Sequence, residues 1–330
     1  MNLNILSVFD GIGCGYYAAK LAGFNVTKYL ASEIDKYPIK IAKKHIPNYK
    51  EIGDVRKLRG IDFVNVDIII GGSPCQGFSI AGKRKGMIMK NIIVTSLDQY
   101  LNLIKDGYEF DISKSKNQSV LFWEFVRLIK EINEAKAALG KPPVFFLLEN
   151  VKTYDKDWIR IISEALGYKP VKINSKLLLP QNRERFYWAN FPITIPEDLK
   201  PTLSMYIPGA VTGAGWSGRK LNSNKFYIPA LTIRKDYIAN CITTWTPTDK
   251  YKGRSHYVNI KDEIAPFTME DLEVLQGYPK GFTEGIPDKE RRKAIGNGWT
   301  IPVIQHIFEC LKKEIETKQG ILLNNVQTRL

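Results

Sequence analysis

The stretch NILSVFDGIGCG, residues 4–15, joins a short apolar segment to a glycine-rich turn. Asn4–Phe9 has the apolar run of a buried strand, and a helical pattern follows at Tyr16–Ala22. Glycines in such a turn let the backbone approach a ligand closely, and the start of the following helix attracts a carboxylate or a phosphate. The stretch therefore predicts a strand, a ligand-binding turn and a helix, in that order.

The same alternation continues along the first half of the chain. We expect strands at Val26–Ser32, Val66–Ile70 and Val144–Leu148, and a helix at Lys36–His45. Strands that alternate with helices indicate an α/β fold with a mostly parallel sheet covered on both faces. Ligands bind at the carboxyl ends of the strands in such sheets, so the residues that follow each strand are candidates for a site.

Two regions depart from this alternation. Residues 87–119, with a helical stretch at Leu97–Ile104, predict an insertion or lid. Residues 191–262 have short β-like runs, glycines and prolines, and predict a small irregular or β domain. We expect residues 1–190 and 263–330 to form the α/β domain together. Further helices are expected at Met269–Leu275 and Ile301–Lys313.

The charge of the chain is strongly positive and uneven. The sequence has 48 Lys and Arg against 34 Asp and Glu, a net charge of +14. Residues 199–260 contain nine Lys and Arg, two Asp and eight aromatic residues. A basic segment with interleaved aromatic side chains suits a nucleic acid, although it is also compatible with a solvated basic surface.

Composition also argues against several classes of protein. No apolar run reaches the ~18 residues needed to cross a membrane, and the N-terminus has no basic region typical of a signal peptide. The four cysteines lie far apart, which argues against a structural zinc site and against a disulfide framework. We therefore expect a protein without a metal or a membrane partner, in a reducing cytoplasm.

The segment GGSPCQGFS, residues 71–79, follows an apolar strand and contains a cysteine at the ligand edge of the sheet. Nearby cationic groups would lower the pKa of the Cys75 thiol and make it a nucleophile, whereas a lone cysteine is more often a small buried residue. Glu33 and Asp54 also follow expected strands and can accept hydrogen bonds from ribose hydroxyls and an adenine amino group. Taken alone, each acid is more often a surface residue.

Pro74-Cys75-Gln76 resembles the nucleophile motif of the DNA (cytosine-5-)-methyltransferase family. Other motifs resemble those of the family, in the family's order, across residues 4–190 and about 265–310. They are Phe9–Gly15 for the cofactor loop, Glu33 for the ribose acid, Asp54 for the adenine contact, Leu121–Phe125 for the helix after the catalytic loop, Glu149-Asn150-Val151, Gln181–Arg185 for Q-x-R-x-R, and Gly296–Trp299 for the closing motif.

The resemblance implies a Rossmann-like S-adenosylmethionine-dependent methyltransferase fold, with residues 191–262 as the target-recognition domain. It implies methyl transfer from S-adenosyl-L-methionine to C5 of a flipped-out cytosine in double-stranded DNA, through a covalent bond from Cys75 to C6, with S-adenosyl-L-homocysteine as product. Glu149 would contact N3 and the exocyclic amine of the base.

The expected site residues form three groups. Catalytic residues are Cys75, Glu149, Arg183 and Arg185, the two arginines facing one side of an extended segment. Cofactor-binding residues are Phe9, Asp10, Gly11, Gly13, Glu33, Ile34, Asp54, Pro74, Asn297 and Gly298. DNA-binding residues are Gln76, Ser79, Lys83, Arg84, Trp216 and Arg219, the last two as candidates for base reading.

Some residues depart from the family pattern. Cys14 stands where a glycine is frequent, and Ile34 stands where many members have an aromatic residue. Gly298-Trp299 and Cys241–Thr244 resemble the de novo methyltransferase branch.

Three alternatives remain open from sequence. They are a tRNA-type cytosine methyltransferase, against which the absence of a Cys-Phe-Thr motif counts, a catalytically inactive DNA-binding relative, and a dinucleotide oxidoreductase. We expect a monomer in the cytoplasm of a bacterial cell or a phage-infected host. Whether a restriction endonuclease of the same restriction-modification system is a partner stays open.

Overall fold

The computed structural model of the chain describes residues 1–74, 87–89, 92–108, 118–152, 155–217, 230–233, 238–239, 241–242, 256–260 and 263–327. By packing, the chain divides into two compact units. The first contains Met1–Ile173, Glu184–Ile195 and Gln305–Leu330, and the second contains Asn174–Arg183 and Pro196–Ile304. The catalytic and recognition domains expected from sequence, with boundaries near residues 190 and 263, stay predictions.

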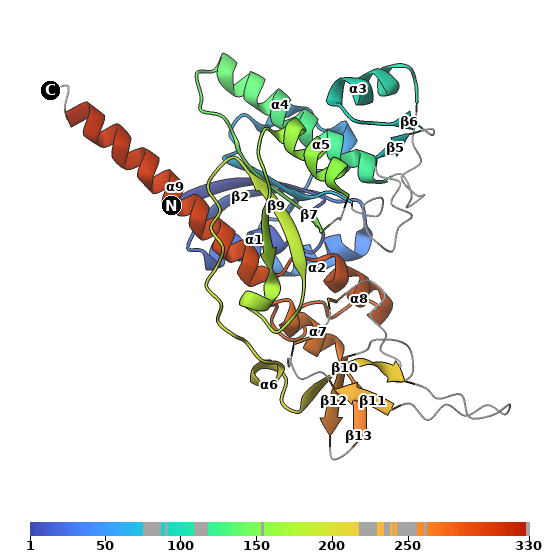
Figure 1. Ribbon diagram of the computed structural model, residues 1–330. Helices are drawn as coiled ribbons and strands as arrows, with labels where there is room; N and C mark the ends of the chain where they lie inside the picture. The colour runs from blue at the N-terminus through green and yellow to red at the C-terminus, as the bar shows by residue number, and fades with distance from the viewer. Residues whose placement is uncertain are drawn as a thin grey trace. The chain divides into compact units, whose positions relative to one another are not determined.

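The first unit is built on a seven-stranded sheet of order β3-β2-β1-β4-β7-β9-β8 (Figure 1). The strands β3, β2, β1, β4 and β7 pair in parallel, and β9 pairs antiparallel with β7. The expected mostly parallel sheet is therefore confirmed. The bounds are β1 Asn2–Val8, β2 Asn25–Ser32, β3 Lys50–Glu51, β4 Ile68–Gly72, β7 Phe145–Val151, β8 Val171–Asn174 and β9 Glu184–Ala189.

Helices cover both faces of this sheet, as Figure 1 shows for α4 and α5 on one side and α1 on the other. Successive strand residues point to opposite faces, so Ile69 packs in the cluster that contains α4 and α5, while Ile70 lies against α1 at Gly15. Phe24 contacts Phe308 of α9 edge to face. The helices are α1 Cys14–Leu21, α2 Lys36–His45, α4 Phe122–Ala138, α5 Lys156–Leu166 and α9 Ile301–Gln327, with 3-10 turns η1 Val55–Lys57, η2 Gly60–Phe63 and η3 Gln118–Leu121.

Side chains and glycines set several helix ends. The Asp35 carboxylate accepts from the Tyr37 amide at 3.2 Å at the start of α2, and Asp155 does the same for Asp157 at 3.0 Å in α5. The helix α5 ends at Gly167, whose φ of 76° belongs to the left-handed region that favours glycine. These local signals explain why α2 begins at its expected residue and why α5, a helix that was not predicted, begins and ends where it does.

The described part of the expected insertion belongs to the core of the first unit. It contains the strands β5 (Ile88–Met89) and β6 (Ile92–Ile93) and the helix α3 (Leu97–Lys105). Met87, Val94 and Tyr100 are fully buried in the cluster that also contains residues of α4. A lid function for residues 87–119 stays a prediction.

The second unit contains a four-stranded antiparallel sheet of order β11-β10-β12-β13. The short strands expected from sequence in this region are therefore present. A compact core packs helix residues such as Leu272, Leu275 and Ile295 against Ala239 and Ile242. The elements are η4 Ser175–Leu177, α6 Leu203–Tyr206, β10 Ala210–Ser217, β11 Ala230–Ile233, β12 His256–Ile260, β13 Glu263–Pro266, α7 Met269–Leu275 and α8 Asp288–Asn297.

Two element ends differ from expectation by three residues or more. The last helix was expected to end at Lys313 but continues to Gln327, where an ion pair of 3.0 Å between Glu314 and Lys318, one turn apart, supports the added length. The strand β7 was expected to end at Leu148 but continues to Val151, since antiparallel pairing with β9 extends as far as Arg185.

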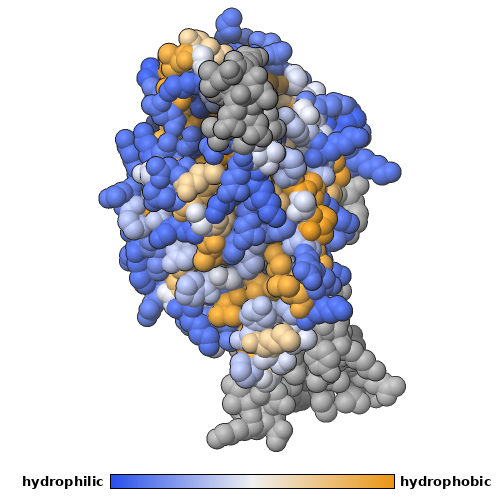
Figure 2. All heavy atoms as spheres, turned by 90° about the vertical axis from the view of Figure 1, so that its left-hand side faces the viewer, coloured by the Kyte–Doolittle hydropathy of each residue, from blue (hydrophilic) through white to orange (hydrophobic). Residues whose placement is uncertain are grey.

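Hydrophilic side chains cover most of the face seen in Figure 2, and hydrophobic residues form small separate patches there. No helix in the described part of the chain has both the length and the apolar character that a membrane span needs.

We expect Gly60→Ala to destabilise the first unit, because α4 passes directly over Gly60. A Cβ at Gly60 would lie 2.6 Å from the Ile132 amide nitrogen and 2.7 Å from the Glu131 carbonyl carbon. Backbone atoms cannot move aside cheaply, so the substitution should cost about 3 kcal/mol of unfolding free energy. The control is Gly140→Ala, where the Cβ meets nothing within 4 Å and only backbone strain of roughly 1 kcal/mol arises. Equal losses in urea unfolding would contradict this packing.

Candidate functional site

Four parallel strands end at one edge of the sheet in the first unit. Val8 of β1 pairs with Ser32 of β2 and with Gly71 of β4, and Gly72 pairs with Glu149 of β7. The segments after β1, β2 and β4 therefore meet the end of β7 at this edge, as expected for a ligand site in a parallel sheet.

The turn after β1 depends on backbone conformations that favour glycine. Phe9, Gly11 and Gly13 have φ values of 57°, 62° and 80°. A Cβ at Gly13 would lie 2.4 Å from Ile46 Cδ1, whereas a Cβ at Gly11 would meet nothing within 4 Å. Gly13 is thus required for packing against α2, and the space beside Gly11 is open to a ligand.

Glu33 ties the ends of β1 and β2 together. Its Oε2 accepts from the Gly11 amide at 2.9 Å, and its Oε1 accepts from the amides of Ile34 and Asp35 at 2.8 and 2.9 Å. Ile34 is 59% exposed beside this carboxylate. An acceptor next to an exposed apolar side chain suits a ligand with hydroxyl groups and a flat apolar ring.

Asp10 is a buried carboxyl group beneath the turn. It accepts hydrogen bonds from the hydroxyls of Tyr29 and Tyr49. Burial raises the pKa of Asp10 to about 7, although hydrogen bonds from Ser7 and Tyr29 act in the opposite direction. Sequence reasoning missed both tyrosines; the signal for Tyr29 was a tyrosine inside an expected strand, whose hydroxyl needs a partner when buried.

Asp54 begins η1 and is paired within its own turn. Its carboxylate accepts from the Arg56 amide at 3.0 Å and from Arg56 Nε at 3.0 and 3.1 Å. Burial raises the pKa of Asp54, but the hydrogen bonds from Arg56 outweigh it and hold that pKa below its usual value. Asp54 is therefore an ionised acceptor, and Arg56 is a partner that sequence reasoning did not identify.

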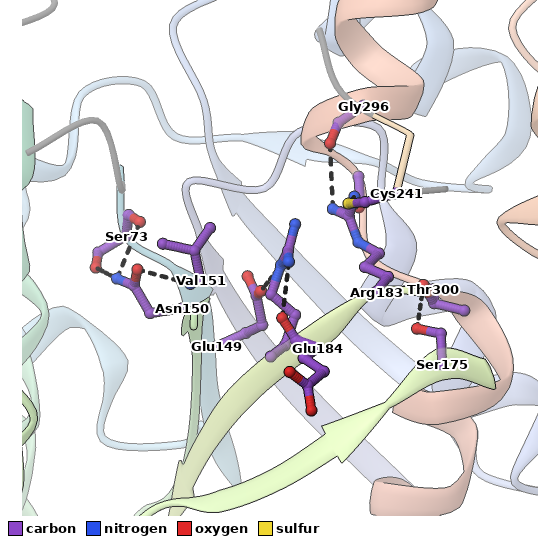
Figure 3. Close-up of polar contacts among 12 residues, drawn as sticks. Ser73, Glu149, Asn150, Val151, Ser175, Arg183, Glu184, Cys241, Gly296 and Thr300 are labelled. Carbon is purple, nitrogen blue, oxygen red and sulfur yellow. Dashed lines mark hydrogen bonds and ion pairs between the residues drawn. The ribbon is translucent and has the colours of Figure 1, made fainter. Parts of the chain in front are cut away.

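The segment that follows β4 is attached to the end of β7. Asn150 Nδ2 donates to Ser73 Oγ at 3.0 Å, and both residues are buried (Figure 3). This bond fixes the backbone just before Pro74, which is the last described residue of the loop. Several expected site residues lie outside the described residues: Cys75, Gln76, Ser79, Lys83, Arg84, Arg219 and the side chain of Trp216, whose backbone belongs to β10.

Glu149 of β7, labelled in Figure 3, forms a largely buried ion pair with Arg185 of β9. Arg185 Nε lies 2.9 Å from Glu149 Oε1, and the two side chains are 14% and 11% exposed. Arg185 Nη1 also donates to the Glu184 carbonyl at 2.8 Å. Two of the four residues expected to be catalytic are thus brought together, with the carboxylate held in one orientation.

Arg183 has different partners, all within the second unit. Its guanidinium donates to the carbonyls of Ile242 at 2.9 Å, Gly296 at 3.1 Å and Gly298 at 2.8 Å. Arg183 is only 4% exposed, so it joins two backbone segments of this unit as a buried cation. Asn297 is exposed at the end of α8 and Gly298 is buried after it. Roles for Arg183 in catalysis and for Asn297 and Gly298 in cofactor binding stay proposals.

No group of three or more His, Cys, Asp or Glu side chains that could hold a metal ion is found where the structure describes the chain.

The raised pKa of Asp10 predicts a pH-dependent stability that Asp10→Asn removes. The folded chain holds the Asp10 proton up to about pH 7, whereas the unfolded chain releases it near pH 4. The protonated carboxyl therefore stabilises the fold most at low pH, and this contribution is lost as the pH rises through about 7. Relative to wild type, Asp10→Asn should gain stability between pH 4 and 7 in urea unfolding. Parallel pH profiles for the two proteins would contradict the assignment.

Comparisons with known proteins show what this chain is similar to. Residues 3–95 match the family of C-5 cytosine-specific DNA methylases. The type II methyltransferase M1.ScrFI of Lactococcus lactis subsp. cremoris is 26% identical over 351 residues, which cover 94% of this chain and 78% of that protein. The orphan methyltransferase M.SPRI of Bacillus phage SPR is 32% identical over 60% of this chain, but the match spans only 38% of that protein.

Solved structures show the same fold at lower identity. The Entamoeba histolytica methyltransferase EhMeth has a TM-score of 0.62 at 16% identity, with 96% of this chain and 99% of that chain covered. A putative DNA modification methyltransferase from an Escherichia coli prophage has a TM-score of 0.58 at 19% identity, with 95% and 99% covered. Residues 3–95 thus match the model of the C-5 cytosine-specific DNA methylase family, and nearly the whole chain is similar to a type II methyltransferase.

Proposed function

We propose that this chain transfers a methyl group from S-adenosylmethionine to C5 of a cytosine in double-stranded DNA, with Cys75 as the covalent nucleophile. The observation that carries the proposal is the buried Glu149–Arg185 ion pair at the carboxyl edge of the sheet. The neighbouring Asn150 holds Ser73, two residues before Cys75. A carboxylate, an arginine and the start of the cysteine loop thus meet at one edge.

The residues at this edge fit S-adenosylmethionine, which supplies an electrophilic methyl group on a sulfonium when bound. The open side of Gly11 admits a ligand close to the backbone. Glu33 offers carboxylate oxygens to ribose hydroxyls, and the exposed Ile34 packs against the adenine face. Asp54 accepts from the adenine amino group. Phe9, Asp10, Gly13 and Pro74 are further proposed cofactor-binding residues of the first unit. Asn297 and Gly298 of the closing motif are kept as proposed cofactor-binding residues as well.

Cytosine C5 needs activation before it can accept a methyl group. The Cys75 thiolate adds to C6, and the electron pair of the C5–C6 double bond becomes available at C5. The new carbon–carbon bond would form as the bond from the methyl carbon to the sulfonium sulfur breaks, with the neutral thioether as leaving group. Loss of the C5 proton to a base then restores the double bond and expels the thiolate. Glu149 contacts N3 and the exocyclic amine while the base carries the extra charge, and Arg185 fixes the orientation of that carboxylate. We keep Arg183 of the Q-x-R-x-R motif as a further proposed catalytic residue.

Double-stranded DNA is the substrate that the charge distribution supports. Residues 199–260 have a net charge of +7, from nine Lys and Arg and two Asp. Basic side chains neutralise phosphates, and this interaction offsets the few kcal/mol needed to extrude a base from the duplex. We assign base reading to Trp216 and Arg219 in this segment, and backbone contacts to Gln76, Ser79, Lys83 and Arg84 near the nucleophile.

Cys75→Ser tests this proposal directly. Duplex DNA that carries 5-fluorocytosine at the target cannot lose a proton from C5, so wild type should form an adduct that resists denaturation. The serine variant should form none, because its hydroxyl is a far weaker nucleophile, while its affinity for S-adenosylhomocysteine should stay within about threefold of wild type. Gel electrophoresis in denaturant and isothermal titration give the two readouts.

The matched control is Cys310→Ser. Cys310 is partly buried in α9 beside His306 and Thr194 and belongs to no proposed site. This variant should form the adduct as wild type does. An adduct that persists in Cys75→Ser would remove Cys75 from the mechanism.

A further inference from the structure

A buried hydrogen-bond network on α4 reaches the helix α3. The Tyr100 hydroxyl of α3 donates to Glu124 Oε1, and Tyr100 is fully buried. The other carboxylate oxygen of Glu124 accepts from Arg127, with a distance of 2.6 Å to Nη2 and 2.8 Å to Nε. Each oxygen of this buried carboxylate is therefore satisfied by a different donor.

The same network reaches η1 on its other side. Arg127 Nη2 donates to the Val55 carbonyl at 3.2 Å, and Nη1 donates to the Leu58 carbonyl at 3.0 Å. These carbonyls lie at the start of η1 and just beyond its end. Farther along α4, Glu131 Oε2 accepts from the Gly60 amide at 2.7 Å. Three hydrogen bonds from α4 thus hold the backbone of residues 55–60.

Asp54 is the residue that this backbone positions. It precedes η1 and caps its first turn through the Arg56 amide. The hydrogen bond from Arg56 to Asp54 raises the pKa of Arg56, burial opposes this, and the nearby Glu124 carboxylate adds a smaller contribution in the raising direction. The placement of the Asp54 carboxylate therefore depends on where Arg127 lies.

The Tyr100 hydroxyl decides how Glu124 and Arg127 pair. Burial raises the pKa of Tyr100, so the phenol keeps its proton and remains a donor. Without that donor, one buried oxygen of Glu124 would have lost a partner that water cannot easily replace. Glu124 would then satisfy both of its oxygens through a bidentate ion pair with Arg127. That pairing would draw the guanidinium away from the Val55 and Leu58 carbonyls.

We propose that Tyr100 is a positioning residue for cofactor binding: through Glu124 and Arg127 it holds η1 so that Asp54 faces the adenine of S-adenosylmethionine. The inference rests on the proposed function and adds a residue that lies outside the family motifs. It also gives the α3 segment a role in cofactor affinity. Because coupling between sites is reciprocal, cofactor binding stabilises the docked position of α3.

A double-mutant cycle tests this pathway with the full chain. Tyr100→Phe removes only the hydroxyl, and should weaken S-adenosylhomocysteine binding about three- to tenfold, the loss of one net hydrogen bond. In an Asp54→Ala background, Tyr100→Phe should weaken S-adenosylhomocysteine binding by less than about 1.5-fold more, because the Asp54 contact that Tyr100 positions is already absent. In turnover, Tyr100→Phe should raise KM for S-adenosylmethionine and leave kcat unchanged. Titrations are run well below the Tm of each variant.

The control is Tyr168→Phe, which removes a hydroxyl from a tyrosine that is 45% exposed and should bind as wild type does. A purely structural role for Tyr100 predicts a lower Tm with unchanged affinity, and that result would overturn the inference. Equal losses in both backgrounds would overturn it as well, since the effect would then bypass Asp54. Unchanged affinity in Asp54→Ala would also end the inference, while adduct formation by Cys75 would still support the proposed function.

Discussion

Parallel pairing of β1 with β2 and β4, and of β4 with β7, is the constraint on which the candidate site depends. Both faces of this sheet are covered by helices, so the strand interiors must be apolar and polar groups can gather only where the strands end. The register places Val8, Ser32, Gly71 and Glu149 near one edge. The glycine turn, the Glu33 carboxylate, the start of the cysteine loop and the Glu149–Arg185 pair follow from that alignment.

The Q-x-R-x-R segment serves both units of the chain. The boundary between the units falls between Arg183 and Glu184. Arg183 joins carbonyls of the second unit, whereas Arg185 pairs with Glu149 in the first. Two arginines that look equivalent in sequence thus have different environments. A substitution at Arg183 removes a buried cation that satisfies several carbonyls, so its effect on activity includes a cost to the second unit itself.

Much of this arrangement could be predicted because it depends on local pattern. The strand at Val26–Ser32 and the helices at Lys36–His45 and Met269–Leu275 are found within a residue of their expected bounds. The partners of Asp10 could not be predicted, since Tyr29 and Tyr49 are 19 and 39 residues away along the chain and meet it only through the sheet. The Tyr100–Glu124 hydrogen bond was missed for the same reason, because a periodic sequence pattern does not show which buried hydroxyl contacts which carboxylate.

We propose that the residues at the edge shared by β1, β2, β4 and β7 carry out methyl transfer to C5 of cytosine in duplex DNA. The most direct measurement supplies S-adenosylmethionine with an isotopically labelled methyl group, together with duplex DNA and, in a parallel reaction, transfer RNA. The products are then digested to nucleosides for mass spectrometry. The account predicts label in 5-methyldeoxycytidine from the DNA. Label in N4-methyldeoxycytidine or N6-methyldeoxyadenosine, or label in the RNA alone, would contradict it.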